Sequence, residues 1–304
     1  MSDRPWHRSL IKTGTRLLLG SARAHFQDAF PRLAIVRASV DAPGEVRYRD
    51  AAVAALSSAS ILRSRSGDTV AIVGSGPSIA GNDLSRLPPQ TAILLNGAIS
   101  LFGQPVADAL SVAVEDERFI WRHFDLLKQR VKDDTPCLFS VEVLRAICEI
   151  DLGFLRDRTI VLIDDIRKPY GARRRRYDTI QAFDFIRRDA EVNAGLSFDP
   201  DRGVFRGGSV AVSALQFALY CEPKTIGLFG IDISNARQPR FYETSGETAS
   251  SGIADAEARI VAHFLLARSV AAERGIEIVN YSPVSALAGA GFGYDDRFSP
   301  SRPA

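Results

Sequence analysis

Short apolar runs alternate with longer amphipathic segments along most of the chain, and these patterns predict strands and helices respectively. The apolar runs, which are typical of buried parallel strands, occupy residues 70–73, 91–96, 109–114, 137–141, 159–163, 225–229 and 276–280. Spacing or composition predicts helices over 50–62, 119–131, 143–150, 210–220 and 253–274. Strands that alternate with helices indicate an α/β fold, a Rossmann-like, mostly parallel sheet with helices on both faces.

The sequence predicts a further helix over residues 5–20, because Pro5 can begin it and Gly20 can end it. Basic residues recur on one face of this helix and apolar residues on the other: Arg4, Arg8, Lys12 and Arg16 against Trp6, Leu10 and Leu17. This pattern suits either an anionic membrane surface or an ordinary helix docked on the domain.

The segments on either side of the α/β pattern are interrupted by turn residues. Residues 29–45 contain Pro31, Pro43 and Gly44 and are expected to form a linker. The polar stretch 235–252 is expected to be a lid-like loop, and residues after 290 a loosely ordered tail. We therefore predict an N-terminal amphipathic helix and linker over 1–45, one Rossmann-like domain over 46–290, and a tail over 291–304.

Composition limits the class of protein without naming a partner. The 304 residues suffice for one large domain or two small ones, and the formal net charge is +2. Cys137, Cys148 and Cys221 lie far apart, without metal-binding spacing, and their odd number fits a reducing compartment. No run approaches a transmembrane length and no signal-peptide pattern is evident. The expected location is the cytoplasm, with possible peripheral contact with the inner membrane.

A basic segment over 167–188 interleaves arginines with aromatic residues: Arg167, Lys168, Arg173 to Arg176, Arg187 and Arg188 among Tyr170, Tyr177, Phe183 and Phe185. Such a segment can bind nucleic acid, an anionic glycan or a phospholipid headgroup, or it can be a solvated surface. We favour the solvated surface and predict no nucleic-acid partner.

Polar and glycine residues follow several of the predicted strands. Ligands of parallel sheets bind at the carboxyl ends of the strands, where this sequence places Gly74, Ser75, Gly76, Pro77, Ser78, Asn96, Glu115, Asp116, Gly230, Asp232 and Ser282. The first turn, Gly74 to Ser78, is either an anion site or the strand-to-helix turn of any α/β protein, and it lacks the lysine of a P-loop. A second turn, formed by Arg206, Gly207, Gly208 and Ser209, precedes the predicted apolar helix 210–220 and is a second candidate anion site.

Four stretches together resemble the bacterial sialyltransferases of glycosyltransferase family 42. They are VAIVGSGPSIAGNDLSRLP, AILLNGA, GGSVAVSALQFALYCEPKTIGLFGID, and ADAEARIVAHF followed by IEIVNYSPVSALAG; they occur in the family's order, and the region from the first to the last of them takes up about two-thirds of the chain. A similar G-x-G-P-S strand occurs in flagellin-modifying glycosyltransferases and archaeal pterin pyrophosphokinases. The resemblance implies a Rossmann-like transferase with a CMP-sugar donor, in which the Gly74 to Ser78 loop and Asn96 hold the nucleotide and Gly207 to Ser209 approach it.

The resemblance also implies catalytic residues, and here the sequence departs from the family. Two tyrosines after the Gly-Ile-Asp stabilise the departing phosphate; Tyr242 matches one, while Ser234 stands at the other position. The family's histidine before the long helix is absent, so a carboxylate is expected to act as base, Glu247 first and Glu115 or Asp116 behind it. His123 and His263 are expected to be packing or surface residues.

The residues favour one function and leave others open. We predict transfer of an acidic sugar, sialic acid or Kdo-like, from a CMP-sugar to a cell-surface glycan or glycolipid such as lipopolysaccharide, with no cofactor and no metal. Metal-dependent pyrophosphoryl transfer of the pterin type is an alternative, because Glu115, Asp116 and Asp232 could hold a cation. A non-catalytic nucleotide- or glycan-binding relative is another.

Overall fold

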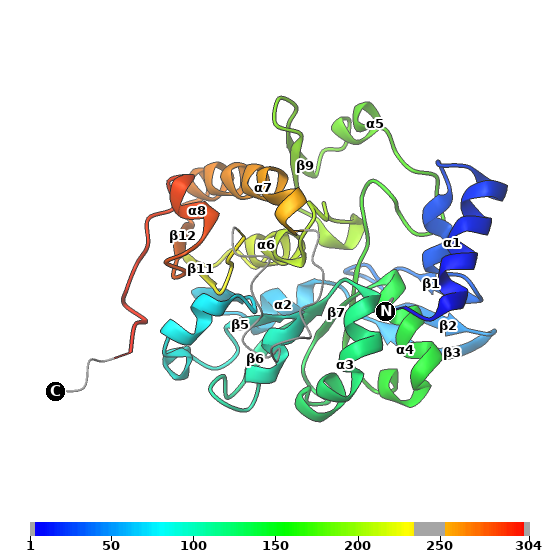
Figure 1. The fold of residues 1–304 in the computed structure, drawn as a ribbon, viewed down its shortest axis with the longest axis horizontal. Helices are drawn as coiled ribbons and strands as arrows, with labels where there is room; N and C mark the ends of the chain where they lie inside the picture. Colours follow the sequence, from blue (N-terminus) through cyan, green and yellow to red (C-terminus); the bar gives the residue numbers. More distant parts are fainter. Residues whose placement is uncertain (1–3, 234–252, 301–304) are drawn as a thin grey trace.

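The structure is a computed structural model that describes residues 4–233 and 253–300, with the backbone alone for 253–255. Ten strands form its central sheet in the order β1-β2-β3-β8-β7-β6-β5-β4-β11-β12 (Figure 1). The bounds are β1 Leu33–Val36, β2 Gly44–Tyr48, β3 Ala51–Leu56, β4 Thr69–Val73, β5 Ala92–Leu95, β6 Ala109–Val114, β7 Cys137–Ser140, β8 Ile160–Ile163, β11 Thr225–Phe229 and β12 Glu277–Asn280. β1–β2 and β2–β3 are antiparallel and all other neighbours are parallel. The predicted α/β class is confirmed.

Two helical layers cover the sheet. Within β4, Val70 and Ile72 belong to one core cluster with helices α6 (Val210–Tyr220) and α7 (Ile253–Glu273). Ala71 and Val73 belong to the other cluster, with α3 (Glu117–Arg130) and α4 (Val141–Ile150). Because side chains alternate along a strand, this split shows that β4 is buried on both faces. Figure 1 shows the two layers on opposite sides of the sheet.

The strand order changes direction between β4 and β11. From β4 the chain adds β5, β6, β7 and β8 on one side, and later adds β11 and β12 on the other. In open parallel sheets the crevice at such a switch point is where ligands bind. The turns after β4 and β11 therefore lie at the expected ligand-binding crevice.

Two expectations for the early part of the chain are wrong. Residues 50–62, expected to be a helix because of their alanines, form β3 and a short helix α2 (Ser60–Arg65). Helix propensity is a weak preference, and here β3 instead pairs with β2 and β8 in the sheet. Residues 29–45, expected to be a linker, contain β1 and the start of β2, which pair with one another at the sheet edge. The division into units at 45 and 290 stays a prediction.

The tail is better packed than expected. Phe292 is buried, and the ring of Phe298 stacks edge-on against Phe229 and Tyr281. Aromatic burial of this kind explains why residues 291–300 follow the core surface. Residues 301–304 lie outside the described residues.

The remaining elements surround this framework. They are α1 (Trp6–Leu19), the two-stranded hairpin β9 (Ile186–Asp189) and β10 (Ala194–Ser197), α5 (Tyr177–Gln181), α8 (Ala286–Gly289) and the 3-10 turns η1 Ala24–Asp28, η2 Pro77–Gly81, η3 Leu84–Arg86, η4 Asn96–Leu101, η5 Leu152–Leu155 and η6 Pro200–Arg202. The predicted N-terminal helix is thus present between Pro5 and Gly20. Within the described residues, no helix is both long and apolar enough to cross a membrane.

Candidate active site

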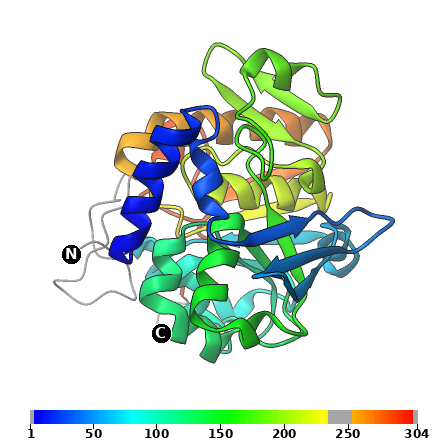
Figure 2. The ribbon, with the colours of Figure 1, turned by 90° about the vertical axis from the view of Figure 1, so that its right-hand side faces the viewer.

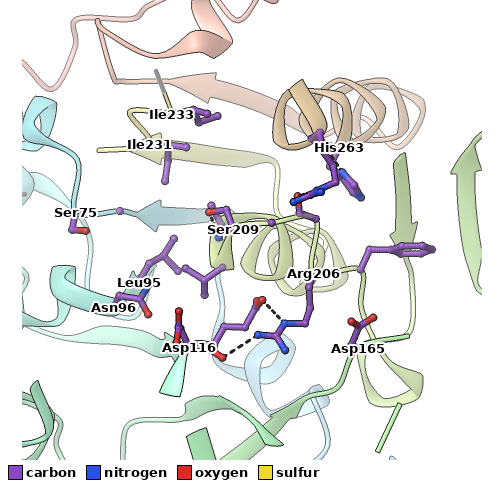
Figure 3. Close-up of a pocket in the computed structure, with 18 of the residues that line it drawn as sticks. Ser75, Leu95, Asn96, Asp116, Asp165, Arg206, Ser209, Ile231, Ile233 and His263 are labelled. Atoms are coloured by element: carbon purple, nitrogen blue, oxygen red, sulfur yellow. Dashed lines mark hydrogen bonds and ion pairs between the residues drawn. The ribbon is translucent and has the colours of Figure 1, made fainter. Parts of the chain in front are cut away.

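A cavity of about 630 Å³ opens at the carboxyl ends of β4, β5, β6 and β11. Of the substrate-binding residues predicted from the sequence, all line it except Ser78 and Ser282: Gly74, Ser75, Gly76, Pro77, Asn96, Glu115, Asp116, Arg206, Gly207, Gly208, Ser209, Gly230 and Asp232. Figure 3 shows Ser75 and Asn96 on one side of the cavity, Ser209 and Arg206 in the middle, and His263 on the other side. The topology therefore brings distant motifs to one place.

The first glycine turn is built by the close approach of two strand ends. Gly76 N–H donates to the Gly230 carbonyl at 2.9 Å. A Cβ on Gly74 would lie 2.5 Å from the Gly230 oxygen, and a Cβ on Gly76 would lie 2.5 Å from the Asp232 carboxylate. Contacts this short are not tolerated, so glycine is required for packing at both positions.

Asp232 acts as a brace for this first turn. Its carboxylate accepts from the Ser78 N–H at 2.7 Å and from the Ser78 hydroxyl. Burial raises the pKa of Asp232, against the hydrogen bonds from Ser78 and Ser282 that lower it. Ser282 is fully buried and its Oγ accepts from the Ile231 N–H at 3.1 Å. Ser78 and Ser282 thus support the wall of the cavity from behind, and their role as substrate contacts stays a prediction.

No α-helix follows the first turn. Residues Pro77–Gly81 form a single 3-10 turn, which corrects the expected strand-to-helix transition. A turn this short supplies no aligned helix dipole, so Gly74 to Ser78 lacks the feature that would make it an anion site by that mechanism.

The second glycine turn leads into a true helix. Gly207 and Gly208 have φ of 54° and 101°, and Ser209 caps α6 by accepting from the Ala211 N–H at 3.2 Å. The positive end of an eleven-residue helix therefore points toward the cavity. Arg259, from α7, lies beside it and donates from Nε to the Gly207 carbonyl at 2.9 Å. A helix N-terminus with an adjacent guanidinium is suited to bind a phosphate.

Arg206 and Glu115 form an ion pair at the floor of the cavity. Arg206 Nε pairs with the Glu115 carboxylate, and Nη1 contacts Glu142 Oε1 at 2.7 Å. The second oxygen of Glu115 accepts from the Ser213 hydroxyl at 2.6 Å. Burial raises the pKa of Glu115, while Arg206 and Ser213 oppose that shift. A carboxylate engaged at both oxygens is a poor base and a poor metal ligand, so the pair positions the second turn instead.

Asp116 has a structural task as well. It caps α3 by accepting from the Arg118 N–H at 2.9 Å and pairs with the Arg118 guanidinium. These hydrogen bonds lower the pKa of Asp116 although burial raises it. The neighbouring Glu117 pairs with Arg145 in the interior. Among the described residues, no group of three or more His, Cys, Asp or Glu side chains is arranged to hold a metal ion.

Asn96 presents an acceptor without a partner. Its backbone is left-handed, with φ of 47°, a conformation that asparagine adopts more readily than most residues. Its Oδ1 is buried, and within residues 4–233 and 253–300 it has no hydrogen-bond partner. Because a buried acceptor left unpaired is costly, this atom suits an amino or hydroxyl donor of a ligand in the cavity.

His263 is buried, in agreement with its expected role as a packing residue, and it also lines the cavity. Its Nδ1 lies 2.8 Å from the Arg259 carbonyl oxygen. Since a carbonyl can only accept, Nδ1 must carry the proton, which leaves Nε2 as the basic nitrogen of the neutral ring. Burial lowers the pKa of His263, so the ring is neutral at physiological pH.

Cations from the predicted solvated segment also reach the cavity. Arg167, Lys168 and Arg174 line it together with Tyr177, whose ring lies beneath the Arg167 guanidinium at 3.7 Å. These residues and Arg259 make the mouth of the cavity favourable to an anion. Sequence analysis missed Arg259 and His263, and their i, i+4 spacing, which places both on one helix face, is the signal that could have found them.

The three predicted catalytic residues, Ser234, Tyr242 and Glu247, lie outside the described residues. Their roles stay predictions.

The similarity of this chain to known proteins is distant. No protein-family model matches this chain, and no curated protein matches it. Among solved structures it is similar to the sialyltransferase CstII from Campylobacter jejuni in complex with cytidine-5'-monophosphate (16% identity, 77% of this chain and 86% of that chain, TM-score 0.36). The same enzyme with CMP-3FNeuAc gives 15% identity, 77% and 89% coverage and a TM-score of 0.38. An alpha-2,3-sialyltransferase from Campylobacter jejuni in apo form gives 14%, 77% and 83%, and 0.35.

Proposed function

We propose that this chain is a glycosyltransferase that moves an acidic sugar, sialic acid or a Kdo-like keto-sugar, from a CMP-sugar donor to a cell-surface glycan such as lipopolysaccharide. One observation carries the proposal: a single cavity joins the N-terminus of α6, the guanidinium of Arg259 and the unpartnered acceptor of Asn96. A nucleoside monophosphate offers a matching anion and matching donors. The motif resemblance agrees with the CMP-sugar class.

The proposed donor lies across the cavity with its phosphate at the second turn. The N–H groups that begin α6 and the Arg259 side chain hold the phosphate, and Asn96 Oδ1 accepts from the exocyclic amino group of cytosine. Uracil has a carbonyl at that position, so the same contact disfavours a UDP-sugar. The first turn closes the cavity by packing and contributes Ser75 to its wall.

The reaction breaks the bond between the anomeric carbon and the phosphate oxygen, and the electron pair leaves with CMP. Positive charge develops on the sugar, and the acceptor hydroxyl adds to the anomeric carbon as its proton passes to a base. The α6 N-terminus and Arg259 stabilise the departing phosphate by electrostatics that are already in place. Tyr242, and less effectively Ser234, add hydroxyl donors to the same phosphate in this proposal.

Two residues compete for the role of base. His263 has a basic nitrogen on a ring that lines the cavity, on the side opposite Asn96 (Figure 3). Glu247 is the base that the motif comparison favours. We propose His263, because its protonation state and its tautomer both suit proton acceptance at neutral pH.

The pyrophosphokinase alternative is disfavoured by the carboxylates it requires. Glu115 is held by Arg206 and Ser213, and Asp116 caps α3. Asp232 braces the Ser78 turn. The chemistry of two metal-bound phosphoryl groups needs carboxylates that are directed toward the cation.

The nucleotide preference of the pure protein tests the proposal. Ligand binding to the folded state raises the melting temperature by mass action, so CMP is expected to raise it more than equal concentrations of UMP, GMP, UDP and ATP, with or without magnesium. A larger shift with ATP that requires magnesium would favour pyrophosphoryl transfer. A preference for UDP would contradict the proposed donor class. CMP binding without CMP release from any CMP-sugar would favour a binding protein.

A further inference from the structure

Helix α1 is docked on the protein through a buried arginine, Arg8, and its apolar side faces solvent. Arg8 is 2% exposed and donates to the carbonyls of Phe30 and Gln27, at 2.5 and 2.6 Å. Arg4 pairs with Glu117 at 2.8 Å. Trp6, Leu10 and Leu17 lie on the opposite side and Leu18 flanks them; these four residues, which we call the apolar stripe, are exposed by 76%, 62%, 79% and 86% in the order Trp6, Leu10, Leu17, Leu18. A helix docked on a core by hydrophobic burial would have the reverse orientation.

The apolar stripe differs from the other exposed apolar residues of the described chain. Val40, Leu152 and Val192 are also exposed, but they lie on separate segments, as single apolar surface residues commonly do. Four large apolar side chains on one exposed helix are the kind of patch that marks a binding surface.

Basic residues are held beside the stripe. The loop that follows β8 exposes Arg173, Arg174 and Arg176. It is tied to the segment after α1, because Arg174 N–H donates to the Ala22 carbonyl at 2.8 Å and His25 Nε2 lies 3.0 Å from the Ala172 carbonyl oxygen. On α1 itself, Lys12 and Arg16 are exposed as well. In Figure 2, α1 runs in dark blue along the side of the molecule that faces the viewer.

We propose that the apolar stripe and these flanking cations dock the protein on the surface of an anionic phospholipid bilayer, with α1 lying in the plane of the interface. Apolar side chains enter the acyl boundary while neighbouring cations meet the lipid phosphates. A second copy of the chain fits less well, because a two-fold interface would set each cationic cluster against its own copy. The charge of the surroundings therefore selects the bilayer as the partner.

A second cavity connects this surface with the site of the proposed transferase reaction. This step rests on the proposed function. The second cavity measures about 660 Å³ and is lined by Lys12 and Arg16 of α1 and by His25. It shares Asp165, Lys168, Arg174 and Arg206 with the first cavity, where the CMP-sugar donor is proposed to bind. An anionic acceptor carried by the bilayer would thus enter next to α1 and meet the donor through the shared wall.

Vesicle co-sedimentation of the full chain tests the docking surface. We expect binding to vesicles of equal parts phosphatidylcholine and phosphatidylglycerol, and little binding to phosphatidylcholine alone. The variant Leu10→Ser/Leu17→Ser/Leu18→Ser is expected to lose at least about tenfold in partitioning, because three buried aliphatic chains are removed from the acyl boundary. The matched control Val40→Ser/Leu152→Ser/Val192→Ser, which removes three exposed apolar residues elsewhere, is expected to bind as the native protein does.

Substitution of arginines in the loop after β8 tests the electrostatic contribution to vesicle binding separately. Arg173→Gln/Arg176→Gln is expected to weaken binding to the anionic vesicles by about tenfold, whereas Arg156→Gln/Lys224→Gln, at exposed positions elsewhere, is expected to change it little. The melting temperature and its rise with CMP are measured for every variant. They should be unchanged, which separates this proposal from the proposed nucleotide site.

Three results would overturn the proposal. They are equal partitioning of the stripe variant and its control, equal binding of the native protein to neutral and anionic vesicles, and a dimer that the stripe variant abolishes while vesicles are not bound. Loss of the CMP response with vesicle binding intact would instead count against the transferase and leave the docking surface standing.

Discussion

The two glycine turns of the cavity look alike in composition but are built for different purposes. The turn after β4 has glycines because β4 and β11 end almost in contact, and Asp232 holds it from one side. The turn before α6 has glycines with positive φ that set up a helix N-terminus next to Arg259. Glycine alone therefore allows two backbone segments to approach closely, whereas an anion site also needs aligned N–H groups and a nearby cation.

The largest expected effect is on the stability of the first turn. Gly76→Ala places a Cβ 2.5 Å from the Asp232 carboxylate, and we expect it to lower the free energy of unfolding by about 3 kcal/mol, as overpacking of a rigid site does. Urea denaturation measures this. Gly81→Ala is the control in the same segment, because a Cβ there meets no atom within 4 Å.

Removing the clash provides the complementary test. Gly76→Ala/Asp232→Gly should recover part of the lost stability, because removal of the whole Asp232 side chain, whose Cβ would lie 2.7 Å from the new Cβ, leaves room for it. Full native stability of Gly76→Ala alone would show that the glycine is there for a ligand and not for packing.

The second turn is expected to carry the chemistry, so its neighbour His263 should control the rate. We expect His263→Gln to lower kcat/KM by about 100-fold, while His123→Gln, a histidine outside both cavities, stays near native. Burial lowers the pKa of His263. As the pH is lowered, the loss of activity should therefore occur at a pH below the ordinary histidine pKa of about 6.5. Native activity in His263→Gln combined with loss of activity in Glu247→Gln would assign the base to Glu247.

The smallest effect concerns Asp232, the brace of the first turn. Its folded-state pKa is raised by burial, so ionisation weakens the folded state as the pH rises from the unfolded pKa of about 4 through the folded value. Asparagine does not titrate. Relative to the native protein, Asp232→Asn should therefore gain stability as the pH rises across that window.

Denaturation midpoints at several pH values measure this difference. A difference that runs the other way with pH would mean that the folded state favours the charged Asp232, as a ligand-directed carboxylate would.

The strands that could be predicted are those whose burial leaves a continuous apolar run. β4, β5, β6, β7 and β8 are apolar along nearly their whole length and were found within a residue or so. The alanines of β3 predict a helix, because alanine is the best helix former, but the pairing of this segment with β2 and β8 overrides that preference. The hairpin of β9 and β10 was missed because Ile186–Asp189 carries two arginines and an aspartate and shows no apolar run.

The sequence predicts those residues of the site that directly follow a strand. Gly74, Asn96 and Gly230 meet because parallel strands end at one edge of the sheet. The i, i+4 spacing of Arg259 and His263 predicts that they share one face of α7, but it does not predict which way that face turns, because the rotation of the helix about its own axis depends on packing. The orientation of α1 was also beyond reach, because an amphipathic pattern does not say which side faces the protein.

The most direct test of the account compares the binding of CMP and cytidine, by isothermal titration calorimetry, to the native protein and to Arg259→Gln, with Arg268→Gln on the same helix as control. We predict that CMP binds the native protein at least about tenfold more tightly than cytidine, because a charge-assisted contact to the phosphate contributes about 1.5–3 kcal/mol. Arg259→Gln should remove most of that advantage and leave cytidine binding unchanged. Equal affinity for CMP and cytidine in the native protein, or an equal loss for both in Arg259→Gln, would contradict a phosphate site at the second turn.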